Sequence, residues 1–170
     1  MQYVKIPKER VGVLVGEEGR TRKEIEGRSR TKILVEDTSV SIEGNPVDEW
    51  ITRDVVQAVG RGFSPEKALL LLQENISFEL IDLSDIVGDS EKTLARVKGR
   101  IIGAKGKSRE KIESLTDCFI SVYGKTAAII GSIDDAPAAR EAVLMLVSGS
   151  PHSNVFRFLE RQKKRGKSIN

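Results

Sequence analysis

The apolar residues of this chain alternate with polar ones in four short runs, and the runs form two pairs. Residues 32–36 are separated by only two residues from 39–43, and residues 119–123 by only two from 126–130. Alternation with a period of two is typical of strands, and so short a connection favours a tight antiparallel hairpin. The sequence therefore predicts two hairpins, one in each half of the chain.

A helical period follows each hairpin, and shorter elements precede it. Val47, Ile51 and Val55 recur every four residues after the first hairpin, and Ala139 and Val143 are spaced in the same way after the second. Three elements are expected before each hairpin: a short strand, an apolar helical turn and a charged helix. In the first half they cover residues 2–6, 11–15 and 20–28, and in the second half residues 93–97, 101–102 and 107–115. Each half is thus predicted to run strand, helix, helix, strand, strand, helix.

The two halves match without a gap when residue numbers are shifted by 87, which brings Gly16 and Gly19 onto Gly103 and Gly106. Further pairs at this shift are Leu14 with Ile101, Ile25 with Ile112, Glu26 with Glu113, Ile33 with Ile120, Ile42 with Ile129 and Val56 with Val143. A match that keeps register this long indicates an internal repeat. We expect two domains, at residues 1–86 and 87–170.

Composition excludes several functional classes. The chain of 170 residues is 39% hydrophobic and 31% charged, as globular proteins are, and no apolar run approaches the roughly 20 residues that cross a bilayer. Cys118 is the only cysteine and His152 the only histidine. We therefore expect no intrachain disulfide, no cysteine zinc cluster and no Ser-His-Asp triad. We expect a monomeric cytoplasmic protein that is not an enzyme, with no cofactor, no metal site and no membrane segment.

Positive charge is concentrated rather than spread, although the net charge is only +3. One cluster comprises Arg96, Lys98, Arg100, Lys105, Lys107, Arg109 and Lys111, and another, near the C-terminus, comprises Arg157, Arg161, Lys163, Lys164, Arg165 and Lys167. The stretch 74–91 between the halves is acidic and is interpreted as a linker on the solvated surface. The C-terminal cluster is interpreted either as a solvated, frayed helix end or as a second phosphate contact.

The second glycine pair has the chemistry of a phosphate-binding loop. Gly103 and Gly106 lack Cβ atoms, so a phosphate can approach the backbone, and the helix expected from Lys107 offers unpaired amides and a partial positive charge. Lys105, Lys107 and Arg109 add full charges, which supply affinity without sequence selectivity. A glycine pair alone usually makes only a turn. The prediction rests on its combination with the flanking apolar and basic residues.

The first glycine pair encloses two acids, in the order Gly16, Glu17, Glu18, Gly19. Carboxylates at this place repel phosphates and oppose the field of the helix end, an effect that Arg20 and Arg22 offset only in part. We expect the first half to keep the same order of elements, to bind a phosphate backbone weakly through a vestigial site, and to act as a brace or a protein-binding surface.

The predicted order and the segment 100–107, Arg-Ile-Ile-Gly-Ala-Lys-Gly-Lys, resemble the type I KH domain, an RNA-binding unit whose glycine loop holds about four nucleotides. The resemblance implies an α+β fold of two tandem type I KH domains (βααββα), each with an additional C-terminal helix. The extensions lead from Ser64-Pro65 to residues 68–72 and from Ser150-Pro151 to residues 155–159.

With an acidic first loop and a basic C-terminal helix, the chain is similar to the archaeal members of the partner-of-Nob (Dim-two) ribosome-assembly family. The resemblance implies binding of single-stranded RNA, in particular small-subunit ribosomal RNA near its 3′ end, and a ribosome-assembly nuclease or a translation-related protein as partner. The RNA-binding residues that it implies are Lys98, Gly99, Arg100, Ile101, Ile102, Gly103, Ala104, Lys105, Gly106, Lys107 and Arg109, joined by Ile120, Ser121, Val122 and Tyr123 on the following strand.

Two other functions remain open from the residues. A general KH adaptor of RNA processing or degradation would use the same loop, and a protein-binding scaffold would have little RNA affinity. Individual residues also have simpler interpretations: Ile101, Ile102, Ile120 and Val122 can serve as core, and Cys118 is expected to pack as a small apolar residue.

Overall fold

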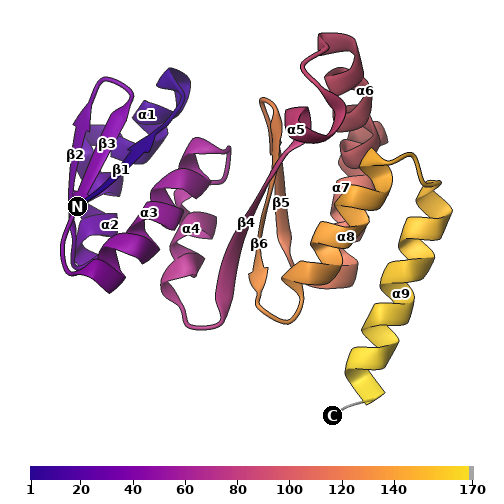
Figure 1. Ribbon diagram of the computed structural model, residues 1–170. Helices are drawn as coiled ribbons and strands as arrows, with labels where there is room; N and C mark the ends of the chain where they lie inside the picture. The colour runs from indigo at the N-terminus through magenta and orange to yellow at the C-terminus, as the bar shows by residue number, and fades with distance from the viewer. Residues whose placement is uncertain (169–170) are drawn as a thin grey trace. The chain divides into compact units, whose positions relative to one another are not determined.

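The structure, a computed structural model, describes residues 1–168, with side chains as far as residue 166 (Figure 1). Two compact units divide the chain between Phe78 and Glu79. In the described residues no helix is long and apolar enough to cross a membrane, and no cluster of His, Cys, Asp and Glu could hold a metal ion.

The first unit has the predicted order of elements. In chain order they are β1 (Gln2–Lys5), α1 (Lys8–Val15), the 3-10 turn η1 (Glu17–Gly19), α2 (Arg20–Ser29), β2 (Lys32–Glu36), β3 (Ser39–Glu43), α3 (Pro46–Gly60), α4 (Pro65–Ala68) and the 3-10 turn η2 (Leu69–Leu72). The strands form an antiparallel sheet in the order β1-β3-β2, and Ile33 pairs with Ile42 across the predicted hairpin. Asn45 caps α3 by accepting a hydrogen bond from the amide of Asp48, with Pro46 in the first turn.

The second unit repeats this architecture with additional elements. They are β4 (Ile76–Asp82), α5 (Leu83–Val87), α6 (Glu91–Ile102), the 3-10 turn η3 (Ala104–Gly106), α7 (Lys107–Thr116), β5 (Phe119–Tyr123), β6 (Thr126–Ser132), α8 (Ala136–Val147) and α9 (His152–Ser168). The sheet order is β4-β6-β5, the same arrangement as in the first unit. Both predicted hairpins and the helices that follow them are confirmed.

The strand predicted over residues 93–97 is wrong, because this segment lies inside helix α6. Ser90 caps that helix through the amide of Thr93, and Leu94, Val97 and Ile101 are buried at helical spacing. The strand that opens the second unit is β4, which falls in the acidic stretch interpreted as a linker. The compact units therefore meet earlier than the boundary after residue 86 that the repeat suggested.

Two matching hydrogen bonds explain this displacement. The amide of Ile6 donates to the carbonyl of Thr38 at 3.0 Å, and the amide of Leu83 donates to the carbonyl of Lys125 at 2.8 Å. Lys125 lies 87 residues after Thr38, but Leu83 lies only 77 residues after Ile6. The second unit thus carries ten additional residues between its first strand and its glycine loop, and a search at one constant shift cannot find that strand.

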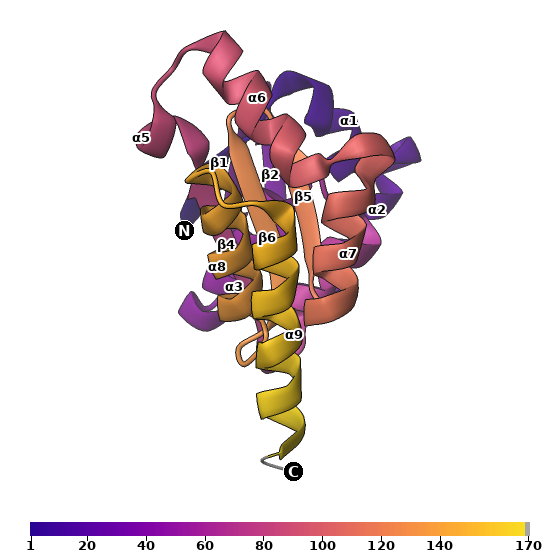
Figure 2. The ribbon, with the colours of Figure 1, turned by 90° about the vertical axis from the view of Figure 1, so that its right-hand side faces the viewer.

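Each unit buries one face of its sheet against its helices. In the second unit the core gathers Ile112 of α7, Ile120 of β5, Val143 of α8 and Leu159 of α9, all 4% exposed or less. Cys118 packs in the same core, as predicted, and its burial raises the pKa of the thiol to about 11. Figure 2 shows α9 alongside α7 and α8, and these helices are in contact. The predicted C-terminal extension therefore completes the core of the second unit.

Candidate nucleic-acid interface

The glycine loop of the second unit adopts a backbone that requires glycine at both ends. Gly103, Lys105 and Gly106 all have positive φ, at 74°, 54° and 77°. A Cβ atom on Gly103 would lie 2.6 Å from Cβ of Ser108, so nothing larger than glycine fits there. A Cβ on Gly106 would meet no atom closer than 3.7 Å, so this side of the loop is open to an approaching group.

Helix α7 begins at this open side without a side-chain cap, and the amide of Lys107 donates to the carbonyl of Ala104. Gly106 is its N-cap residue, and no side chain caps the helix start. The first amides of a helix have no partner within the helix, and together they favour an anion. Lys105 and Lys107 flank the helix start and are exposed. The loop therefore brings a helix start and two exposed positive charges together, an arrangement that suits a phosphate group.

A carboxylate holds the loop helix against the edge of the sheet. Glu113 of α7 accepts a hydrogen bond from the amide of Ile120 at 2.9 Å, and its other oxygen lies 2.7 Å from Nη1 of Arg109. Strand β5 lies at the edge of its sheet, so peptide groups that alternate with those paired to β6 point outward. The amide of Ile120 points to Glu113, and by this alternation the peptide groups of Val122 face the same open edge. Their donor and acceptor are therefore directed away from β6.

The predicted apolar site residues divide by burial. Ile101 and Ile120 are 0% and 4% exposed and belong to the core, so they support the surface without reaching a base. Ile102 and Val122 are half-buried and remain accessible beside the loop. We use the term glycine-loop surface for residues 102–107 together with Val122. Of the other predicted residues, Gly99 is exposed, Lys98 is half-buried, and Ser121 and Tyr123 lie on the sheet face opposite Ile120.

Arg100 has a positioning role that the sequence did not predict. Its Nε donates to the carbonyl of Leu146 at 3.0 Å, and its Nη2 donates to the carbonyl of Ser150. Nε2 of His152 lies 2.8 Å from the carbonyl oxygen of Arg100, which adds a link to the start of α9. Arg100 thus fixes the end of α8 and the turn into α9 to the helix that carries the glycine loop.

The first unit makes the same connection from another position. Arg10 donates to the carbonyls of Val59 and Phe63, each at 2.8 Å, and these acceptors lie 87 residues before those of Arg100. Arg10 precedes its glycine loop by one helical turn more than Arg100 does. At the shift of 87, Arg10 falls three residues before Arg100, yet both arginines donate to equivalent carbonyls. The two units therefore share this hydrogen-bonded connection, although the aligned sequences do not show it.

The first glycine loop has the same backbone as the second but opposite chemistry. Gly16, Glu18 and Gly19 have φ angles of 74°, 53° and 76°. Glu17 and Glu18 are both exposed at the loop, as is Arg20 at the helix start, while Arg22 is half-buried and donates to the carbonyl of Ile33 at 3.3 Å. The phosphate-repelling carboxylates therefore stand at an intact loop, as predicted.

The C-terminal basic cluster lies on helix α9, which the structure describes as far as Ser168. Arg157, Arg161, Lys163 and Lys164 are exposed on it, and the side chain of Lys167 lies outside the described residues. The described part of the cluster is helical, and both interpretations of it, a solvated helix end and a second phosphate contact, stay predictions. The sequence did not predict the contact between α9 and α7 that Phe156 makes. The centroid of its ring lies 4.5 Å from Nζ of Lys111.

Comparison with known proteins bears on both units. A family model described as KH_PNO1_2nd, eukaryotic type KH-domain (KH-domain type I), matches residues 7–76 and again residues 77–164. KH domain-containing protein MJ0443 of Methanocaldococcus jannaschii is 43% identical over 171 residues, which cover 97% of this chain and 75% of that protein.

Solved structures agree with this match. Dim2p from Pyrococcus horikoshii OT3 has a TM-score of 0.88 at 47% identity and covers 94% of this chain and 98% of that chain. A chain in the crystal structure of the a/eIF2alpha-aDim2p-rRNA complex from the same organism has a TM-score of 0.89 at 47% identity, covering 96% and 94%. A protein from Aeropyrum pernix has a TM-score of 0.94 at 40% identity, covering 99% and 93%. Two type I KH units, these relatives and the coverage of nearly the whole chain together place the protein in the archaeal Dim2 family.

Proposed function

We propose that this protein binds single-stranded RNA on the glycine-loop surface of its second unit, in a binding rather than an enzymatic role. The observation that carries the proposal is the open loop at the start of α7, which no side chain caps, between the exposed Lys105 and Lys107. Phosphates bound there would leave the bases free to meet Ile102 and the edge of β5 at Val122. Single strands suit this arrangement because their base edges are unpaired.

The RNA that we propose is small-subunit ribosomal RNA near its 3′ end, bound during ribosome assembly in the cytoplasm. Support comes from the related aDim2p of Pyrococcus horikoshii, which has been crystallised in a complex with rRNA and a/eIF2alpha. A translation-related protein or a ribosome-assembly nuclease is the proposed protein partner, and the chain is proposed to be a monomer outside such complexes.

For the first unit we propose a supporting or protein-binding role. Its acidic loop disfavours RNA, and Tyr3 and Leu34, exposed by 67% and 56%, flank Ser41 in one row across the outer face of its sheet. Exposed apolar groups on adjacent strands are suited to contact with another protein.

Crosslinking the full chain to RNA in a lysate of the source organism, followed by sequencing of the bound RNA, tests the proposal. We expect a footprint near the 3′ end of small-subunit rRNA for the natural chain, and loss of it in an Ala104→Asp/Lys105→Asp variant. Both positions are exposed, and aspartate tolerates the positive φ of Lys105 better than most residues.

The control is Lys92→Asp, an exposed charge change in the first turn of α6, away from the loop. It should leave the footprint in place. A footprint that survives the double substitution would contradict the assignment of the site, and a footprint on other RNAs would favour the general adaptor of RNA processing.

A further inference from the structure

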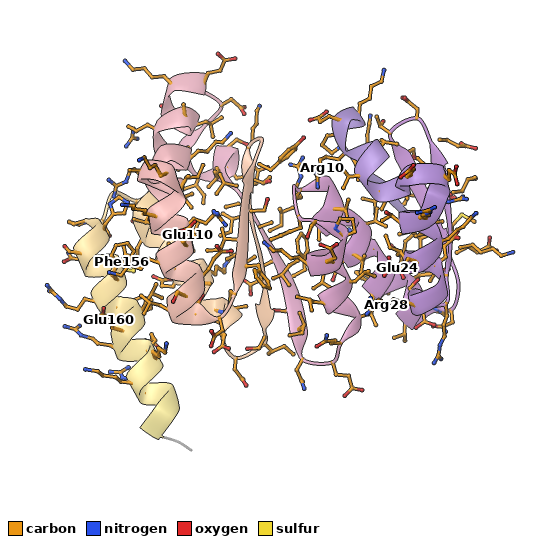
Figure 3. The ribbon with its side chains drawn as sticks, turned by 180° about the vertical axis from the view of Figure 1, so that it is seen from behind. Arg10, Glu24, Arg28, Glu110, Phe156 and Glu160 are labelled. Carbon is orange, nitrogen blue, oxygen red and sulfur yellow. The ribbon has the colours of Figure 1, made fainter. Side chains whose placement is uncertain are left out.

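A pocket lies beside the glycine loop of the second unit, between the start of α7 and helix α9. Its volume is about 300 Å³, and it is lined by Gly103, Ala104, Lys107, Ser108, Lys111, His152 and Phe156. This volume lies at the small end of the range for small-molecule sites. Figure 3 labels Phe156 on α9, and the contact of its ring with Lys111 places it toward α7.

The pocket shares residues with the glycine-loop surface and extends from it to the side of α7 that faces away from strand β5. Arg109 and Glu113 face strand β5, as their contacts with each other and with Ile120 show. Lys107 and Lys111 each precede one of them by two residues, which turns them by about 200° around the helix axis. Gly103 and Ala104 lie in the loop and also line the pocket. An RNA strand held at the loop can therefore pass over the start of α7 and reach the pocket.

The lining is almost entirely apolar, which suits the flat face of a nucleobase, and charged groups stand only at its edge. The ring of Phe156 and the methyl group of Ala104 offer apolar surface, while the exposed Lys107 and Lys111 stand at the rim. Ser108 is only 6% exposed, and in the described residues its hydroxyl has no hydrogen-bond partner. A buried hydroxyl left unpaired costs free energy, and a polar ligand atom can pair with this one once the Ser108 side chain rotates toward the pocket.

The geometry points to a base-binding pocket, in which one nucleobase of the RNA strand on the glycine-loop surface enters between α7 and α9 and stacks against Phe156. This inference rests on the proposed RNA binding and extends it past the family's glycine loop to helix α9. Continuity with the loop and the positive rim select RNA as the occupant. Lys111, whose ammonium lies over the ring, would exchange this exposed contact for the phosphate of the entering nucleotide.

The corresponding place in the first unit has different residues. A shift of 87 puts Leu69 at the position of Phe156, Glu24 at that of Lys111 and Glu17 at that of Ala104. Leu69 is 3% exposed in turn η2, which packs against α2, and Glu24 lies 3.8 Å from Arg28 in an ion pair on α2 (Figure 3). The first unit therefore lacks the aromatic ring, and of the two rim cations it keeps only one, Arg20 at the position of Lys107.

Fluorescence anisotropy of the full chain with three labelled RNAs tests the inference. One RNA has about four nucleotides, enough for the loop surface alone. The second carries this sequence extended at both ends by adenosines, and the third is extended by abasic nucleotides, which keep the phosphates and remove the bases. We expect the adenosine-extended RNA to bind about tenfold more tightly than the abasic one, within the range for one base stacked on an aromatic ring.

Phe156→Leu, which introduces the residue of the first unit, should abolish this difference and leave binding of the short RNA unchanged. Phe158→Leu is the matched control, because Phe158 is also a half-buried residue of α9 packed on the core but does not line the pocket. It should keep the difference. Thermal unfolding of both variants shows whether packing is retained.

A tenfold preference that persists in Phe156→Leu would overturn the inference, as would equal binding of the two extended RNAs by the natural chain. Failure of the natural chain to bind even the short RNA would contradict the proposed function itself, and the inference with it. The short RNA thus separates failure of the RNA site from failure of the pocket.

Discussion

The two glycine loops have one backbone and two chemistries. Their three positive φ angles agree within 2°, yet one loop contains Glu17 and Glu18 where the other contains Ala104 and Lys105. The backbone is set by the glycines and by the residue packed under the first of them, Thr21 or Ser108. Loop conformation and loop charge are therefore independent, and the charge of a loop can be reversed without loss of the fold.

The arginine anchors show a similar separation between contact and sequence. Arg10 and Arg100 hold equivalent carbonyls at the ends of α3 and α8, although they occupy positions of the repeat that differ by three residues. The fold requires a donor over these carbonyls, and a long side chain can supply it from either of two helical turns. Conserved tertiary contacts therefore need not appear as conserved residues in a repeat.

The largest expected effect comes from giving the second loop the chemistry of the first. Ala104→Glu/Lys105→Glu should lower the affinity of the full chain for single-stranded RNA about 100-fold, since it removes a cation and places two carboxylates where phosphates bind. Anisotropy titration at fixed salt measures the loss. The thermal unfolding temperature should change little, because the first loop already carries two glutamates on the same backbone. An affinity within threefold of the natural chain (about 0.7 kcal/mol) would contradict the role of the loop.

The reverse exchange sharpens the comparison with a smaller effect. Glu17→Ala/Glu18→Lys, made in the full chain that carries Ala104→Glu/Lys105→Glu, should raise RNA affinity about tenfold, as two repulsive charges leave and one attractive charge enters. The same titration measures the gain. Glu36→Lys serves as control because it adds positive charge at an exposed position of the same unit, at the end of β2. A gain of equal size in the control would show that net charge, not the loop, determines affinity.

The smallest effect distinguishes the two glycines of one loop. Gly103→Ala should destabilise the second unit by about 1 kcal/mol more than Gly106→Ala, because both have positive φ but only the first would also force a Cβ against Ser108. Thermal unfolding of the two variants in parallel measures the difference. Gly99→Ala, where a Cβ has open space and the backbone is helical, should be tolerated. Equal losses at Gly103 and Gly106 would show that backbone strain alone governs the loop.

The relation of sequence to structure follows from these comparisons. The hairpins, the helices after them and the position of both glycine loops could be predicted because each depends on local periodicity or on glycine itself. Strand β4 also carried a signal, the alternation of Ile76, Phe78 and Leu80, and α6 carried the helical spacing of Leu94, Val97 and Ile101. The comparison at one constant shift concealed both elements. The ten additional residues lie between β4 and the second glycine loop, so β4 and the start of α6 do not align with the first unit at that shift.

The sequence by itself determined the repeated order of elements, the glycine backbone and the charge of each loop, because these follow from neighbouring residues. Only the tertiary structure decided that Ile101 and Ile120 support the surface from within the core, that Arg100 and His152 fix helix α9, and that Phe156 meets Lys111 beside the loop. These contacts join residues more than 40 positions apart in several cases. Their formation depends on how the helices pack, which no local pattern specifies.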